Sequence, residues 1–248
     1  MRALPLVLAA MVTSSVAIAA DPAPEATQPG APFSRPGALG GAVKATERLP
    51  ISGLSAVETD ALGIVFMASN GRFVLRGELW DLWSGKKLDT MAAIRDAASK
   101  LDMSRLPLKP ADLGAMTYGN GAKRVQIWVD PKCPYCHQLL GQIGPFTKDH
   151  TFEIYVVPLL GRDSQELTRR ISCATDQGAA LSALTGGKVA EMRALTEASG
   201  CSVEPIQKRM VTAQMLGITG VPVIVAPDGR VNRGLPPDLA AFLAGGAE

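Results

Sequence analysis

The sequence predicts an α/β protein in which a small β-rich module precedes a main domain with a helical insertion. A strand-like run at 125–129, a helical pattern and a second strand-like run at 152–160 follow one another. This order implies a βαβ unit with a largely parallel pair of strands. Helical patterns then fill residues 161–216. Upstream, residues 49–89 alternate between short strand-like runs and turns such as Asn70-Gly71, which is typical of hairpins.

The composition fits a globular protein that does not bind nucleic acid. The chain has 248 residues, enough for one ordinary domain and a smaller one, and 47% of them are hydrophobic. Lys and Arg number 25 and Asp and Glu 23, so the formal charge is only +2. No dense basic cluster is present, and this argues against nucleic acid as a partner.

Residues 1–20 are predicted to be an export signal. Arg2 supplies a short positive region, residues 4–18 an apolar one, and Ala17-Ile18-Ala19 a small-residue cleavage motif. The alternative is an uncleaved membrane anchor, but the apolar part is shorter than the ~20 residues that a spanning helix needs. We therefore expect cleavage and an oxidising compartment, in which the four cysteines of the chain would pair.

Three segments are expected before the main domain. Residues 21–48 are rich in Pro, Ala and Gly and are predicted to form a flexible tether. The β-rich module at 49–89 is too small to be stable alone, so it should pack on the rest of the chain or on a second copy. Residues 90–104 are predicted to form a linker helix with one apolar face.

The main domain is expected to span residues 105–248. Its first part, Leu113–Tyr118 and Lys123–Val129, resembles a second hairpin around Asn120-Gly121. The second of these strands leads directly into the sequence Cys133-Pro134-Tyr135-Cys136-His137.

Cys133 and Cys136 are the candidate reactive residues. A helical pattern follows them, so Cys133 is predicted to lie where a helix begins and where Pro134 suits the first turn. Free N–H groups and the positive end of the helix dipole meet there and favour a thiolate, which is the nucleophile in disulfide exchange. Cys136 follows about one turn later and could close a ring with Cys133.

A zinc site is the competing interpretation of the two cysteines. It would normally need two further Cys or His ligands at similar spacing. The remaining candidates form no second CxxC and no HxxxH pattern: Cys173, Cys201, His137 and His150. We therefore favour a redox dithiol, with no metal and no cofactor. For Cys173 and Cys201 the simplest interpretation is a structural disulfide in the helical insertion, and a catalytic role is the alternative.

Gly220-Val221-Pro222 precedes an apolar strand. A proline at the entry of a strand is unusual because it removes a hydrogen-bond donor from the ladder. A cis Val221–Pro222 bond would resolve this, although cis bonds are a minority, ~5–6% of X–Pro bonds.

Together these features resemble the bacterial periplasmic disulfide isomerases of the DsbC/DsbG type, which have the thioredoxin fold. The resemblance covers about residues 50–242. It depends on six short motifs: Ile51-Ser52-Gly53-Leu54, Asn70-Gly71-Arg72, Asp130 with Cys133-Pro134-Tyr135-Cys136-His137, Cys173-Ala174, Gly187-Lys188 and Gly220-Val221-Pro222.

The resemblance implies a thioredoxin-like domain and a V-shaped homodimer formed through the β-rich module, with a cleft for misfolded disulfide-containing proteins. It implies a periplasmic location and a membrane thiol reductase as electron donor. Cys133 would be the nucleophile, Cys136 the resolving thiol and Cys173–Cys201 a structural disulfide. Val221 and Pro222 would face the cysteines and present backbone groups to the substrate.

Two departures from the family bear on the direction of catalysis. Val221 stands where these isomerases usually carry Thr, and in this the chain is more like the dithiol oxidases. Pro134-Tyr135 matches DsbG rather than the Gly-Tyr of DsbC. Both positions adjust the balance between dithiol and disulfide. We expect a secreted thiol–disulfide isomerase or reductase. The alternatives are a dithiol oxidase and a dimeric holdase chaperone with incidental cysteines.

Overall fold

The computed structural model describes residues 41–51, 53–105 and 109–245. The predicted export signal at 1–20 and most of the predicted tether, residues 21–40, lie outside the described residues.

The N-terminal module contains an antiparallel sheet followed by a separate short hairpin. The four strands of the sheet pair in sequence order, β1-β2-β3-β4, as expected of a meander. The strands are β1 Val43–Arg48, β2 Leu54–Thr59, β3 Gly63–Ala68 and β4 Val74–Leu75, and the hairpin consists of β5 Trp80–Asp81 and β6 Lys86–Lys87.

Strand β1 corrects the predicted tether. Residues 43–48 were assigned to a flexible segment, whereas the structure pairs them with β2, for example Thr46 with Val57. The strand was missed because its sequence, VKATER, lacks a regular apolar alternation, and most of its side chains are exposed. Pairing here depends on backbone hydrogen bonds to a partner strand, which the local sequence does not indicate.

The predicted linker helix is α1, Met91–Ala98, and it also covers the module's sheet. Thr90 caps it, because its side chain accepts a hydrogen bond from the Ala93 amide. Met91 and Ile94 are buried in one apolar cluster with Phe66 of β3. The module therefore gains part of its core from its own linker helix.

The main domain is built on a five-stranded sheet with the order β11-β10-β8-β9-β7. Strands β8 and β9 are parallel and are joined through helix α2, which confirms the predicted βαβ unit. The other neighbouring pairs are antiparallel. The elements are β7 Met116–Tyr118, β8 Lys123–Val129, α2 Pro134–Gln142, β9 His150–Val156, β10 Val223–Val225 and β11 Val231–Arg233.

The predicted hairpin between β7 and β8 is wrong. Strand β7 pairs with β9 instead, with Met116 opposite Ile154. The connecting residues Gly119 and Gly121 lie against the backbone that enters β9. A Cβ on Gly119 would come within 2.5 Å of the His150 carbonyl oxygen, so the chain crosses the end of β9 rather than turning back.

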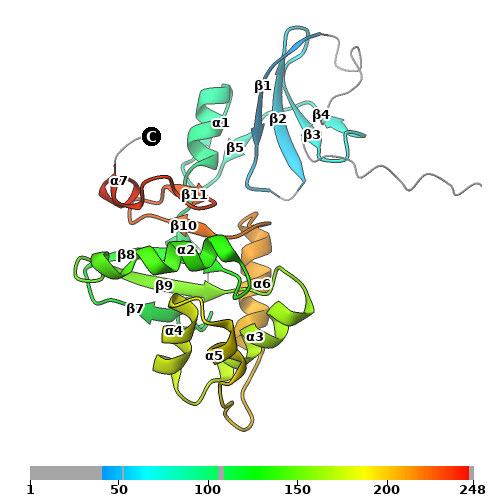
Figure 1. Cartoon of the computed structure of the whole chain (residues 1–248). Coiled ribbons are helices and arrows are strands. Elements are labelled where there is room, and N and C mark those ends of the chain that lie inside the picture. Colours follow the sequence, from blue (N-terminus) through cyan, green and yellow to red (C-terminus); the bar gives the residue numbers. More distant parts are fainter. Residues whose placement is uncertain (1–40, 52, 106–108, 246–248) are drawn as a thin grey trace, which may run out of the picture. The chain divides into compact units, whose positions relative to one another are not determined.

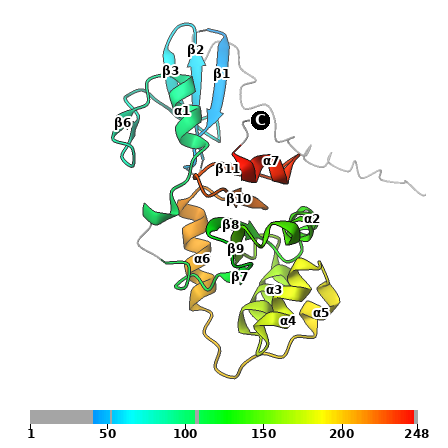
Figure 2. The ribbon, with the colours of Figure 1, turned by 90° about the vertical axis from the view of Figure 1, so that its left-hand side faces the viewer.

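Helices cover both faces of the sheet. Figure 2 shows α6 on one face and α2 with α3, α4 and α5 on the other. On the α6 face, Trp128 and Tyr155 stack with ring centroids 4.6 Å apart. The predicted insertion at 161–216 corresponds to four helices, and a further helix follows β11: α3 Arg162–Cys173, α4 Gln177–Thr185, α5 Val189–Arg193, α6 Glu204–Met215 and α7 Leu239–Ala244 (Figure 1).

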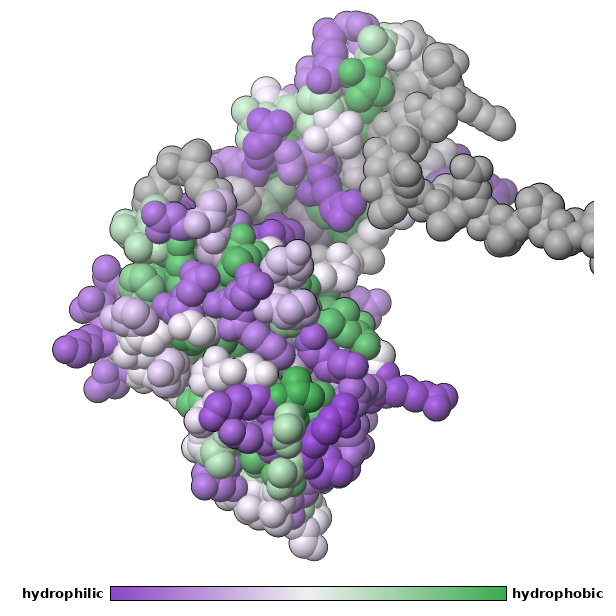
Figure 3. Space-filling view, viewed as in Figure 1, coloured by the Kyte–Doolittle hydropathy of each residue, from purple (hydrophilic) through white to green (hydrophobic). Residues whose placement is uncertain are grey.

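Hydrophilic residues are spread over the face seen in Figure 3, with apolar residues in separate patches between them. Among the helices within the described ranges, none combines the length and the hydropathy needed to cross a membrane.

Candidate active site

Cys133 lies where the sequence places it, at the start of α2. It is the N-cap residue, and its sulfur accepts a hydrogen bond from the Cys136 amide at 3.2 Å. Pro134 occupies the first turn, where a missing N–H is tolerated. The Cys133 amide donates to the Asp130 carbonyl at 3.1 Å, which fixes the turn that leads into the helix. The Cys133 sulfur therefore lies at the end of the helix that favours negative charge.

Cys136 lies one turn later on α2 and is fully buried. Burial, and then the hydrogen bond with Cys133, raise the pKa of the Cys136 thiol far above its ordinary value. The structure holds both residues as free thiols. The two cysteines thus differ in position and in one titration: Cys133 caps the helix, whereas Cys136 lies within it and keeps its proton to a higher pH than an ordinary thiol.

Val221 and Pro222 are brought to the cysteines from a distant part of the chain. Strand β10 runs antiparallel to β8, with Val223 opposite Trp128, so the segment before β10 reaches the end of β8. The Cys133 thiol donates to the Val221 carbonyl at 3.6 Å. The Val221–Pro222 peptide bond is cis, as the sequence analysis expected.

Pro134 and Tyr135 lie on the exposed side of the site. Tyr135 is 60% exposed. Both residues flank the reactive sulfur in sequence, and their effect on the dithiol–disulfide balance stays a prediction.

Asp130 was named in the sequence analysis only as part of a motif, and no role was assigned to it. It follows β8 directly and is fully buried. Its carboxylate accepts hydrogen bonds from the Lys132 amide at 2.8 Å, the Leu160 amide at 2.8 Å and the Ser164 hydroxyl at 2.7 Å. A lone aspartate after a buried strand was the available signal, but its partners up to 34 residues away were not visible in the sequence.

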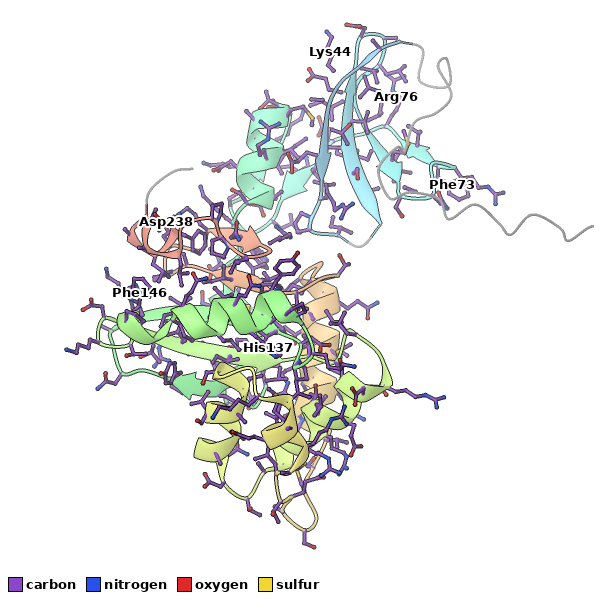
Figure 4. All side chains as sticks on the ribbon, viewed as in Figure 1. Lys44, Phe73, Arg76, His137, Phe146 and Asp238 are labelled. Carbon is purple, nitrogen blue, oxygen red and sulfur yellow. A yellow bond between two sulfur atoms is a disulfide. The ribbon has the colours of Figure 1, made fainter. Side chains whose placement is uncertain are left out.

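A group of charged residues forms one rim of the site. Lys132 and Arg193 both bind Asp163, at 2.7 Å and 2.6 Å, and these two cations lower the pKa of Asp163. His137 follows Cys136 on α2, and its Nε2 atom lies within hydrogen-bond distance of the Pro131 carbonyl oxygen, at 2.8 Å. Figure 4 shows His137 directed from α2 toward the insertion, where Gly187 leaves room for the ring.

Cys173 and Cys201 form a disulfide with a Cα–Cα distance of 5.6 Å. Cys173 is the last residue of α3, at the opposite end of that helix from Ser164. The 12-residue helix places about 18 Å between its ends. The bridge therefore joins α3 to the segment before α6 and lies apart from the Cys133–Cys136 pair.

A metal centre was the alternative use of the cysteines. Over residues 41–51, 53–105 and 109–245, no three side chains among His, Cys, Asp and Glu come together as a possible ligand group.

Residues 115–243 match the thioredoxin-like domain family. A probable thiol:disulfide interchange protein DsbC of Bordetella avium is 30% identical over 168 residues, which is 66% of this chain and 56% of the relative. The thiol:disulfide interchange protein DsbC of Haemophilus influenzae is 24% identical over 199 residues, covering 78% of this chain and 80% of the relative.

The chain thus spans little more than half the length of its Bordetella relative. Among solved structures, a disulfide interchange protein from Neisseria gonorrhoeae matches with a TM-score of 0.46 and 23% identity, over 56% of this chain and 97% of that one.

Proposed function

Because the chain belongs to the thioredoxin-like family, we propose that it is a thiol–disulfide oxidoreductase that rearranges wrong disulfides in misfolded proteins. The observation that carries the proposal is the position of Cys133. Its sulfur caps α2 and contacts the Val221 carbonyl, while its partner Cys136 is buried one turn away. The relatives named as thiol:disulfide interchange proteins support the same chemistry.

The reaction begins with the Cys133 thiolate. It attacks one sulfur of a substrate disulfide, so that a Cys133–substrate disulfide forms while the other substrate sulfur leaves as a thiolate. That thiolate can attack a different disulfide of the substrate and so release a further substrate thiolate. A substrate thiolate then attacks the substrate sulfur of the mixed disulfide, which forms the rearranged disulfide and releases Cys133 as a thiolate. Alternatively, Cys136 loses its proton and attacks Cys133, which oxidises the pair and reduces the substrate by two electrons.

Val221 and Pro222 are proposed to receive the substrate backbone. An extended segment beside Val221 could pair with its backbone groups like an added strand, and this would bring the substrate disulfide to Cys133. A proline at the next position has no N–H to offer a neighbouring strand, which leaves this edge to a ligand.

We infer that the protein acts in the periplasm as a homodimer and that a membrane thiol reductase keeps Cys133 and Cys136 reduced. The export signal predicted at residues 1–20 supports the location. An isomerase needs a supply of electrons, because every resolution by Cys136 leaves the pair oxidised.

The two edges of the module's sheet differ, and the difference supports pairing along β4. Strand β1 carries charged side chains on its edge, a common protection against association. Beside β4, Phe73, Val74 and Leu75 are 55%, 41% and 60% exposed, and Figure 4 shows Phe73 pointing away from the sheet. Leu75→Lys should therefore give monomers in sedimentation. The matched change Val43→Lys on β1 should leave a dimer, and a monomeric wild type would refute dimer formation.

Refolding of a protein with scrambled disulfides tests the proposed activity. The reduced wild-type protein should restore the native pairing, and the Cys133→Ala variant should not.

A dithiol oxidase is the second candidate, favoured by Val221, and it would act faster on a fully reduced substrate than on a scrambled one. A holdase would suppress aggregation equally well in a Cys133→Ala, Cys136→Ala double variant and would show no exchange. In cells, a mainly reduced Cys133–Cys136 pair would support the isomerase over the oxidase.

A further inference from the structure

The segments that adjoin the Cys133 sulfur differ in charge. Helix α2, with the sequence PYCHQLLGQ, contains no Asp, Glu, Lys or Arg, and residues 217–225, which supply Val221, contain none either. Lys132, by contrast, directly precedes Cys133 and reaches the first turn of α3, where its Nζ lies 2.7 Å from the Asp163 carboxylate. Any preference of the site for charged substrates therefore depends on the side where Lys132 meets α3.

The Lys132–Asp163 pair belongs to a cluster of three side chains. Arg193, on α5, donates to both oxygens of the same carboxylate, at 2.6 Å and 2.7 Å. The side chains of Lys132 and Arg193 nevertheless stay 41% and 51% exposed. An ammonium group has three N–H donors and a guanidinium group has five, so both cations keep donors that Asp163 does not use. A second carboxylate, from a ligand, can therefore bind here without displacing Asp163.

Cations are in excess around this cluster. Arg162, the first residue of α3, is exposed and forms no ion pair with any residue that the structure describes. Three cations therefore accompany two carboxylates: Lys132, Arg162 and Arg193 with Asp163 and the fully buried Asp130. The neighbouring charges balance, because they form three further ion pairs: Glu166 with Arg170, Glu191 with Lys188 and Glu197 with Arg169.

We propose that Lys132, Arg162 and Arg193 form a cationic rim that selects substrates with acidic residues beside the reacting cysteine. The inference rests on the proposed function, and it names the class of substrate for the same site. A residue next to the reacting substrate cysteine comes close to Lys132, because Lys132 is itself next to Cys133. Aspartate or glutamate at that place can accept charged hydrogen bonds from the rim, whereas lysine or arginine is repelled.

Asp163 determines how strong this preference is. Its carboxylate holds Lys132 and Arg193 together, but it also offsets one of their two positive charges. Removal of the Asp163 charge should therefore strengthen the preference for acidic substrates if the net charge of the rim decides it. Loosening of the rim alone would weaken the preference. The two causes predict opposite signs, which makes Asp163 the informative position.

Paired peptides that differ only in charge test the selectivity. Each peptide carries one cysteine in a disulfide with thiopyridine, flanked by glutamates in one peptide and by lysines in the other. The Cys133 thiolate attacks the peptide sulfur, so a Cys133–peptide disulfide forms and coloured thiopyridone leaves. A Cys136→Ala background preserves this adduct for mass spectrometry. Each rate is divided by the rate of a small neutral thiol with the same peptide, which removes the intrinsic reactivity of the peptide.

The ratio of the two corrected rates, glutamate peptide over lysine peptide, is the quantity of interest, because the reactivity of Cys133 cancels in it. We expect a ratio of roughly ten in dilute buffer, which falls toward one at about 1 M salt, where the Debye length is only ~3 Å. Lys132→Gln should lower the ratio about threefold, and Asp163→Asn should raise it by a similar factor.

Lys148→Gln is the matched control and should keep the wild-type ratio. Lys148 is exposed and precedes β9, so it lies at the opposite end of the parallel β8–β9 pair from Cys133. Equal corrected rates without the substitutions in dilute buffer, or an Asp163→Asn ratio that stays or falls, would overturn the cationic rim and leave the proposed function intact. Absence of an adduct at Cys133 with either peptide would instead contradict the proposed function, and the inference with it.

Discussion

Each cysteine pair of the main domain has one member at a helix end, and the two ends are opposite in kind. Cys133 caps the N-terminus of α2, whereas Cys173 is the last residue at the C-terminus of α3. The helix dipole favours a negative charge at the first position and opposes it at the second. Cys133 and Cys136 are free thiols and Cys173 is bonded to Cys201.

The proposed function makes Cys133–Cys136 the reactive pair and Cys173–Cys201 the bracing pair, and this difference in helix end is the physical basis of that assignment. At Cys133, the Cys136 amide and the Val221 carbonyl both contact the sulfur, and the Cys136 thiol lies one turn away. At Cys173, the disulfide with Cys201 joins the end of α3 to the segment before α6, and neither sulfur is a free thiol. The helix end at which a cysteine lies therefore decides whether its surroundings favour a negatively charged sulfur.

The largest effect is expected from changing the reactive pair. Cys133→Ala should abolish exchange, because no other thiol among the described residues lies at a helix start. Cys136→Ala should instead accumulate mixed disulfides with substrates, since the resolving thiol is missing. Non-reducing gel electrophoresis of trapped complexes measures both. Complexes that form equally in Cys133→Ala would contradict the assignment of the nucleophile.

A smaller effect, on stability alone, is expected from the bracing pair. Replacing Cys173 and Cys201 by Ala removes a bridge between residues 28 apart in sequence, which should cost about 2–4 kcal/mol of unfolding free energy. Urea unfolding measures the loss, and exchange assayed below the unfolding midpoint should stay close to wild type. If a folded variant lost exchange, the disulfide would belong to the reaction rather than to the scaffold.

Val221→Thr should change only the equilibrium between the dithiol and disulfide forms of Cys133 and Cys136. The new hydroxyl would lie near the Cys133 sulfur, which contacts the Val221 carbonyl, and it could donate to the thiolate. We expect a change in reduction potential of tens of millivolts, since about 30 mV corresponds to a tenfold change in the equilibrium constant. Equilibration with glutathione measures it, and an unchanged potential would remove this position from the site.

The smallest effect concerns the stability of the reduced protein in alkali. Burial raises the pKa of Cys136 above its ordinary value of 9.0, so the unfolded chain releases a proton that the folded protein retains. Unfolding free energy should therefore fall as the pH rises through 9, and the fall should be shallower in Cys136→Ala. Tyr155, whose pKa is also raised by burial, is present in both proteins and cancels in the comparison. Equal slopes in urea unfolding would refute the burial argument.

Local patterns predicted the elements that carry the chemistry. The strand before Cys133, the helix after it and the entry of Pro222 into β10 each depend on neighbours within a few residues, which the sequence displays. Contacts between distant segments were harder to predict. The partner of β7 is β9 rather than β8, and strand β1 is held by backbone pairing with little apolar patterning.

The donors to Asp130 illustrate the same limit. Leu160 and Ser164 lie 30 and 34 residues from it, and neither is unusual in its own sequence context. Only the fold brings them to the end of β8.

Competitive alkylation of the reduced protein tests the central claim most directly. A limiting amount of iodoacetamide is added at several pH values, and mass spectrometry of the peptides reports the labelled cysteine. We predict that Cys133 is labelled first at every pH, that Cys136 follows only in alkali, and that Cys173 and Cys201 stay unlabelled. Equal labelling of Cys133 and Cys136 near neutral pH, or early labelling of Cys173, would contradict the account.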